Sequence, residues 1–145
     1  MLRILARRLR KEESGLTLIE LLVVILIIGL LAAIALPSFL GQRGRAQDAT
    51  AKSAVRTAAE AMEAYYVNAQ TFVGANTTRL KAIEPSLNQA NGFAVKSAGV
   101  STYSVSVTSK SPAATKYLMT RTAAGVVTRT CDDKGVNGCS KAKTW

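Results

Sequence analysis

The sequence contains no histidine and only two cysteines among its 145 residues. Histidine is the commonest general base near neutral pH and a frequent metal ligand, so its absence removes much of the chemistry of catalysis. Two cysteines cannot supply the four thiolates of a structural zinc site. The chain also lacks a glycine-rich phosphate loop and a cluster of carboxylates. We therefore expect no enzyme activity, no metal site and no cofactor.

Negative charge is also scarce, with 9 Asp and Glu against 19 Lys and Arg, a net charge of +10. A basic chain of this kind can bind nucleic acid or an anionic surface. Its apolar content of 48%, however, equally suits a membrane segment with basic flanks. Which interpretation holds depends on where the apolar residues lie.

The apolar residues are concentrated in one stretch. No charged residue occurs in the 22 positions between Glu20 and Arg43, and residues 21–36 are apolar apart from Gly29. A helix of about 20 residues crosses a bilayer core of ~30 Å. The five cations and two anions of residues 1–15 favour a cytoplasmic location for that end. The apolar run is longer than the roughly 7–15 residues of a secretory signal, and no A-x-A-like cleavage site closely follows it.

Glu20 is an unusual residue for an apolar segment, because a carboxylate inside a membrane costs about 2.5–3.5 kcal/mol on insertion scales. No cation lies between it and Arg43. Cleavage after Gly15 would create a free amine on Leu16, four residues away, which could neutralise the carboxylate. The simpler alternative is an acidic residue at a helix start without a specific partner.

The segment SGLTLIE at residues 14–20, followed by the apolar run and Pro37, closely resembles the class III signal of type IV pilins and pseudopilins. The resemblance covers about the first 40 residues strongly and the remainder only in general architecture. Leu16 stands where many members of the family carry Phe.

The resemblance implies that a prepilin peptidase cuts between Gly15 and Leu16 and that Leu16 becomes N-methylated. It further implies a precursor in the cytoplasmic (inner) membrane, and then a homo-oligomeric helical filament built by a pilus assembly machinery outside the cell. Glu20 would pair with the Leu16 amine of the preceding subunit. In this family the stretch corresponding to Gly29–Pro37 can lose helicity on assembly, and a fixed kink is the alternative.

A long helix is expected over residues 16–69. Residues 43–69 are rich in good helix formers, and Pro37, which frees the Ala33 carbonyl, should kink or loosen the helix locally. We divide the chain into a cleaved leader (1–15), a membrane and filament-core helix (16–40), an amphipathic helix (41–69) and a globular head (70–145). The amphipathic helix carries an apolar stripe at spacings of three and four, which should pack on the head. Its members are Ala51, Val55, Ala58, Met62 and Tyr65 or Tyr66.

The head shows the period-two alternation of β-strands. We expect strands at residues 103–108, 116–121 and 125–130, a weaker one at 92–95, and a short helix near 78–83. The fold class is therefore α+β, with a long N-terminal helical spine and a small antiparallel β-sheet head, as in the pilin fold.

Cys131 and Cys139 enclose seven residues rich in turn formers, and a location outside the cytoplasm permits their oxidation. We expect a disulfide, which pilins often carry near the C-terminus; free thiols or a two-thiolate metal site are the less favoured alternatives. Asp132, Asp133 and Asn137 offer oxygen atoms to calcium, but their spacing matches no established calcium loop. We therefore interpret them as solvated turn residues.

The resulting hypothesis is a structural subunit of a type IV pilus, polymerised through its N-terminal helix. Within the same family, the alternative is a pseudopilin of a type II secretion or DNA-uptake machine. A different class of function is a displayed module that contacts DNA or a surface, and a membrane protein that retains residues 1–15 is a further alternative. The cations available for such a contact are Lys110, Lys116, Arg121, Arg129, Lys141 and Lys143.

Overall fold

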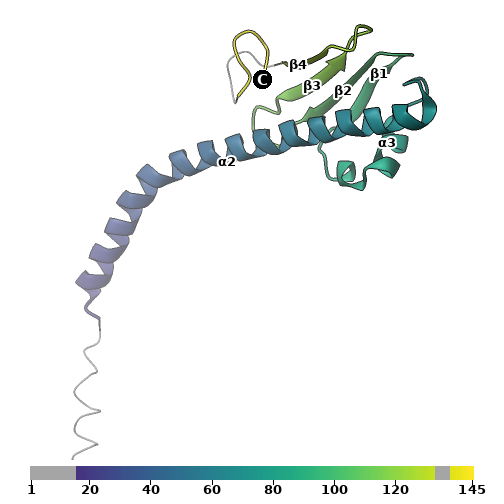
Figure 1. The fold of residues 1–145 in the computed structure, drawn as a ribbon. Helices are drawn as coiled ribbons and strands as arrows, with labels where there is room; N and C mark the ends of the chain where they lie inside the picture. The colour runs from purple at the N-terminus through teal and green to yellow at the C-terminus, as the bar shows by residue number, and fades with distance from the viewer. Residues whose placement is uncertain (1–15, 133–137) are drawn as a thin grey trace, which may run out of the picture. The chain divides into compact units, whose positions relative to one another are not determined.

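The computed structural model of the chain describes residues 16–132 and 138–145 (Figure 1). The chain divides into two compact units, Met1–Phe39 and Leu40–Trp145. The first described element, the helix α2, extends through both units, whereas every strand belongs to the second.

The α2 helix spans Leu18–Ala69, which confirms the prediction of one long helix. It begins two residues later than expected because Thr17 caps its first turn rather than joining it. Pro37 lies inside the helix, and residues on both sides of it are α-helical. The missing N–H of the proline therefore does not end the helix.

One face of α2 is buried in the second unit. The members of the predicted apolar stripe Ala51, Val55, Ala58 and Met62 are buried, and Tyr65 and Tyr66 pack against the same core. Burial of this face joins the helix to the sheet, because the same core cluster contains side chains from β2 and β3.

Two short helices connect α2 to the sheet, namely α3 (Thr77–Ile83) and the 3₁₀ helix η1 (Pro85–Asn88). The Asn76 side chain caps α3 by accepting a hydrogen bond from the Arg79 backbone N–H at 2.9 Å. Since a proline disfavours helical geometry in the residue before it, α3 ends ahead of Pro85. The expected helix near residues 78–83 is thus confirmed.

The sheet has four antiparallel strands in the order β1-β2-β3-β4, which confirms the α+β class. The strands are β1 (Ala94–Ala98), β2 (Tyr103–Thr108), β3 (Lys116–Arg121) and β4 (Val127–Cys131). The bounds of β2 and β3 match the prediction, and the bounds of β1 and β4 do not. Each of these two strands begins two residues late because a glycine with positive φ belongs to the preceding turn: Gly92 (+59°) and Gly125 (+79°).

Alternation along β2 places Tyr103, Val105 and Val107 in the core, each fully or almost fully buried. Val105 is the register partner of Met119 and Val107 that of Tyr117, so β3 contributes the same face. The core of the second unit therefore consists of one sheet face packed on the stripe of α2.

Candidate functional site

The start of α2 holds the residues of the predicted processing and assembly site. Glu20 Oε2 accepts hydrogen bonds from the backbone N–H and the hydroxyl of Thr17, both at 2.8 Å. In return, Thr17 Oγ1 accepts the Glu20 backbone N–H at 3.2 Å. This reciprocal pair is a capping box, which satisfies free N–H groups at the helix start and places a negative charge at the positive end of the helix dipole.

The capping role of Glu20 was missed in the sequence, although Thr17-Leu-Ile-Glu20 is a T-x-x-E capping signature. Glu20 Oε1 makes no hydrogen bond to the residues that the structure describes, so capping and a second partner are compatible. Leu16 is exposed beside the helix start. Gly15 lies outside the described residues. Pairing of Glu20 with a Leu16 amine therefore stays a prediction.

The first unit exposes an almost continuous apolar surface. α2 contains a stretch long and apolar enough to cross a membrane, and none of that stretch is buried. Such a surface requires a bilayer or other apolar helices as its surroundings. The exposed side chains include Leu18, Ile19, Leu22, Ile25, Leu26, Ile28, Leu30, Ile34 and Phe39.

Gly29 interrupts this apolar surface with a shallow hollow, lined also by Leu22, Ile25, Leu26 and Leu30. A Cβ at Gly29 would have no atom within 4 Å, so the glycine is not required by packing within the subunit. Its effects in the free subunit are a lower helix propensity and room for the close approach of another helix.

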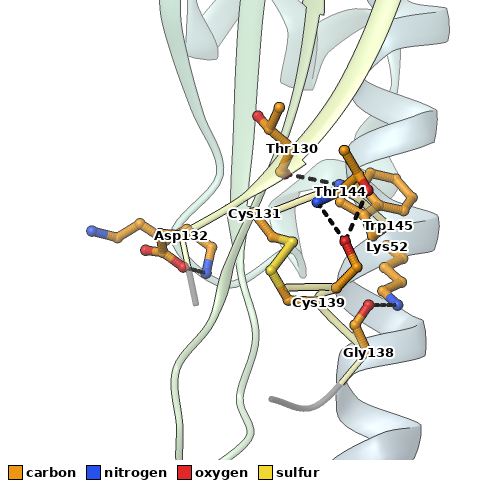
Figure 2. The surroundings of a disulfide bond; sticks show 10 residues. Lys52, Thr130, Cys131, Asp132, Gly138, Cys139, Thr144 and Trp145 are labelled. Atoms are coloured by element: carbon orange, nitrogen blue, oxygen red, sulfur yellow. Dashed lines mark hydrogen bonds between the residues drawn. A yellow bond between two sulfur atoms is a disulfide. The ribbon is translucent and has the colours of Figure 1, made fainter. Parts of the chain in front are cut away.

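The second region of interest is the C-terminal end of the sheet (Figure 2). Cys131 and Cys139 form a disulfide with a Cα–Cα distance of 5.9 Å. The Lys143 backbone carbonyl accepts a hydrogen bond from the Cys131 backbone N–H at 2.9 Å, and the Trp145 indole N–H donates to the Thr130 carbonyl, also at 2.9 Å. The chain after the disulfide is therefore held against β4 rather than projecting from it.

Lys52 of α2 contacts both the chain near the disulfide and the sheet. Its ammonium donates to the Gly138 carbonyl at 2.7 Å and lies 5.2 Å from the Tyr117 ring centroid (Figure 2 shows the hydrogen bond). The Trp145 ring is approached by the guanidinium groups of Arg56 at 5.2 Å and Arg129 at 5.8 Å. These cation–π contacts were not anticipated, because no sequence pattern links Trp145 to residues of α2.

Of the three residues considered as calcium ligands, Asp132 is the one that the structure describes. The Asp132 carboxylate accepts the Lys116 backbone N–H at 2.7 Å and so acts as a local turn residue. Asp133 and Asn137 lie outside the described residues. Within residues 16–132 and 138–145, no group of three or more His, Cys, Asp or Glu side chains is arranged to hold a metal ion.

The six cations considered for DNA or surface contact do not form one patch. Lys116 and Arg121 lie at opposite ends of β3. Arg121 forms an ion pair with Glu63 at 2.8 Å, and Arg129 faces Trp145.

Two polar clusters, one linking α2 to the sheet and the other linking α2 to the connection between β2 and β3, were missed in the sequence. In the first, Glu63 pairs with Arg121 and accepts a hydrogen bond from the Tyr103 hydroxyl; burial, reinforced by this carboxylate, raises the pKa of Tyr103 to about 12. In the second, the buried Asp48 accepts the Ser111 hydroxyl at 2.8 Å, while its other oxygen, Oδ2, has no partner among the described residues. Both contacts join residues far apart in sequence, so no local signal reveals them.

Comparison with known proteins decides the family. Residues 10–36 match the family described as the prokaryotic N-terminal methylation motif. The chain is 33% identical over 94 residues to the type IV wide pilus major component PilA4 of Thermus thermophilus, an alignment that covers 64% of this chain and 71% of that protein. The chain belongs to the type IV pilin family. This family consists of structural pilins and pseudopilins rather than enzymes.

Other relatives match shorter parts of this pilin-family chain. A fimbrial protein of Neisseria meningitidis is 41% identical over 66 residues, or 46% of this chain. The type II secretion system core protein G of Pseudomonas aeruginosa is 38% identical over 56 residues, or 39% of this chain. In both cases the chain spans 39% of the relative's length. No solved structure matches the chain.

Proposed function

We propose that the protein is a structural subunit that polymerises through its N-terminal helix into an extracellular type IV pilus. The observation that carries this proposal is an unburied apolar helix with Glu20 in its first turn, which begins inside the residues that match the methylation motif. A soluble monomer would leave this surface in water, whereas a bilayer before assembly and neighbouring helices after it would cover the surface.

Processing would prepare the subunit for assembly. Cleavage between Gly15 and Leu16 by a prepilin peptidase removes a leader with a net charge of +3 and exposes the Leu16 amine, which is then methylated. On a growing filament this amine pairs with Glu20 of the incoming subunit. Because a shifted arrangement leaves both charges in an apolar medium, the pairing selects one register.

Gly29 and Pro37 would contribute to assembly through the same helix. Glycine lowers helix propensity, and proline removes one backbone hydrogen bond inside the helix. The stretch between them is therefore the part of α2 where helicity is lost at least cost when subunits pack. In the single subunit this stretch is α-helical, and that helix would be the starting state for such a change.

Intact mass of the exported protein tests the proposal. Loss of residues 1–15 together with the gain of one methyl group is expected, and electron microscopy of the same cells should show long surface filaments containing the subunit. A retained leader would overturn the proposed processing. Correct processing without long filaments would overturn the pilus assignment.

A pseudopilin is the second candidate, because the chain also matches a type II secretion system core protein over 39% of its length. Such a subunit would assemble into short filaments within the cell envelope. Its loss would stop protein secretion or DNA uptake without removing surface filaments. Deletion of the gene, followed by both measurements, separates the two candidates.

A further inference from the structure

Three valines stand exposed at one end of the second unit. Val67, Val73 and Val100 expose 71%, 51% and 69% of their surface. Val67 lies in the last turn of α2, and the turn between β1 and β2 brings Val100 beside the segment after α2, where the Phe72 backbone N–H donates to the Val100 carbonyl at 3.2 Å. We call these three residues the valine end.

The chain around the valine end carries no charge. No Lys, Arg, Asp or Glu occurs in residues 64–78 or in residues 97–109. Charged residues border these stretches: Lys96 of β1, Arg79, which donates to the Gly74 carbonyl at 3.1 Å, and the Glu63–Arg121 pair. Apolar side chains in a charge-depleted area with charges at its border are the composition of an interface core.

The other end of the same unit contains a cavity of about 170 Å³, which we call the socket. It is formed by α2, by the connection from η1 to β1, and by the end of β2. β2 relates the two ends: Tyr103, at its start, contacts Phe72 beside the valine end, and Val107, near its finish, lines the socket. The socket residues are Gln47, Thr50, Ala51, Ala54, Gln89, Ala90, Asn91, Val107, Thr108 and Lys110.

We infer that the valine end of one subunit docks in the socket of a second copy of this chain. Ala51, Ala54, Ala90 and Val107 give the socket an apolar part, its other lining residues are polar, and Lys110 is the single charged one. A cavity of about 150 Å³ is large enough for a benzene molecule, so the volume of the socket suffices for a valine side chain.

Charge selects a second copy as the occupant. Residues 16–145 carry 14 Lys and Arg against 7 Asp and Glu, so most faces of two copies repel each other. The valine end and the socket are the faces that can meet without this repulsion. Because they lie at opposite ends of one unit, their contact is heterologous and can repeat from subunit to subunit, as an open helical polymer requires. This inference rests on the proposed filament and adds a contact between heads to the contact between helices.

The test compares Val100→Asp with Val126→Asp in the full chain, expressed in the cells that make the filament. Val126, 57% exposed in the turn before β4, is the matched control because it lies outside both surfaces. We expect Val100→Asp to lower the yield of sheared filaments by about tenfold or more, with processing and membrane level unchanged. Val126→Asp should stay within about twofold of the parent chain. Equal yields for the two variants would overturn the inference.

Photo-crosslinking provides the second measurement. A benzophenone amino acid at position 100 should join two subunits, and the linked peptide should contain residues 47–54 or 89–91. A linked peptide from elsewhere, or filaments without any link, would overturn the docking alone. A link to the socket in cells that form no long filaments would support the docking and overturn the pilus assignment instead.

Discussion

At the scale of single residues, the Glu20 carboxylate has one observed task and one proposed task. Its Oε2 closes the capping box with Thr17, and its Oε1, which has no hydrogen-bond partner among the described residues, is the atom proposed to meet a cation. A capping box accepts glutamine as well as glutamate at its third helical position, whereas neutralising an amine requires the charge. The two tasks can therefore be separated by mutation.

We predict that Glu20→Gln reaches the membrane and is processed but lowers filament yield by about tenfold or more, because the Leu16 amine then stays uncompensated in an apolar medium. Thr17→Val is the matched control: it loses the capping hydroxyl at a cost of roughly 0.5–2 kcal/mol to the helix but keeps the charge. Quantitative immunoblots of sheared filaments give the yields. Normal filaments from Glu20→Gln would contradict the pairing.

Tyr103 is the second residue with a measurable consequence. Its pKa of about 12 lies above the ordinary value near 10, so the folded state holds the phenol proton more tightly than the unfolded state. The resulting contribution to stability is complete below about pH 10 and is lost as the pH rises through 12. Part of the alkaline decrease in unfolding free energy should therefore come from this group.

We predict that Tyr103→Phe shows a smaller decrease in unfolding free energy between about pH 10 and pH 12 than the parent chain, and loses roughly 1 kcal/mol at neutral pH with the hydrogen bond to Glu63. Urea unfolding of the full chain in detergent, repeated across this range, measures both effects. Tyr65→Phe, whose hydroxyl instead contacts Val73 and Arg79, is the control. An identical pH dependence in Tyr103→Phe and the parent would rule out the assignment.

At the scale of elements, β4 depends on the disulfide and on the chain that follows it. β4 is an edge strand, and the C-terminal segment pairs with it through the isolated bridge between Thr130 and Thr144 and through the Trp145 hydrogen bond. An edge strand otherwise presents free backbone groups to other chains. The disulfide keeps the covering segment in place.

Replacement of Cys131 and Cys139 by serine should lower the unfolding free energy by roughly 2.5 kcal/mol, the chain-entropy value for so short a loop. Since Trp145 is the only tryptophan, its fluorescence should report a change around this region before global unfolding. Thermal unfolding followed by tryptophan fluorescence and by circular dichroism tests both expectations. Unchanged stability and fluorescence would mean that the hydrogen bonds alone hold the segment.

The elements also indicate how far sequence reasoning extends. β2 and β3 were predicted to the residue because their apolar alternation coincides with a buried face, while the starts of β1 and β4 were wrong because backbone conformation at Gly92 and Gly125 sets them. The motif around Glu20 gave the family and the candidate assembly site. The Asp48–Ser111 contact, separated by 63 residues, could not be predicted, because such a contact depends on packing of the complete unit.

At the scale of the whole molecule, positive charge is the dominant property of residues 16–145. Glu63–Arg121 is the one ion pair formed within residues 16–132 and 138–145, so most cations face solvent without a carboxylate partner. In a filament, the positive charges of neighbouring subunits would lie close together. Repulsion between them extends over a Debye length of about 30 Å at 0.01 M salt but only about 8 Å at 0.15 M.

Filaments should therefore release subunits several-fold faster at about 0.01 M than at about 0.15 M ionic strength. The exposed Lys96 of β1 offers a probe, because Lys96→Glu lowers the net charge by two and should weaken the salt dependence. Sedimentation separates filaments from released subunits at each salt concentration. Greater filament stability at low salt would show that attraction between opposite charges, rather than repulsion, dominates.

The hydrogen-bonded surroundings of the disulfide have a practical consequence. On one side of residues 133–137 the chain is fixed by Cys131 and by the bonds of Asp132 to β3; on the other it is fixed by Cys139 and by the Lys52 contact to Gly138 (Figure 2). None of these anchors uses a side chain from within the five-residue segment. A foreign peptide inserted there would begin and end at fixed points, and the anchors that hold the sheet register would not depend on its sequence.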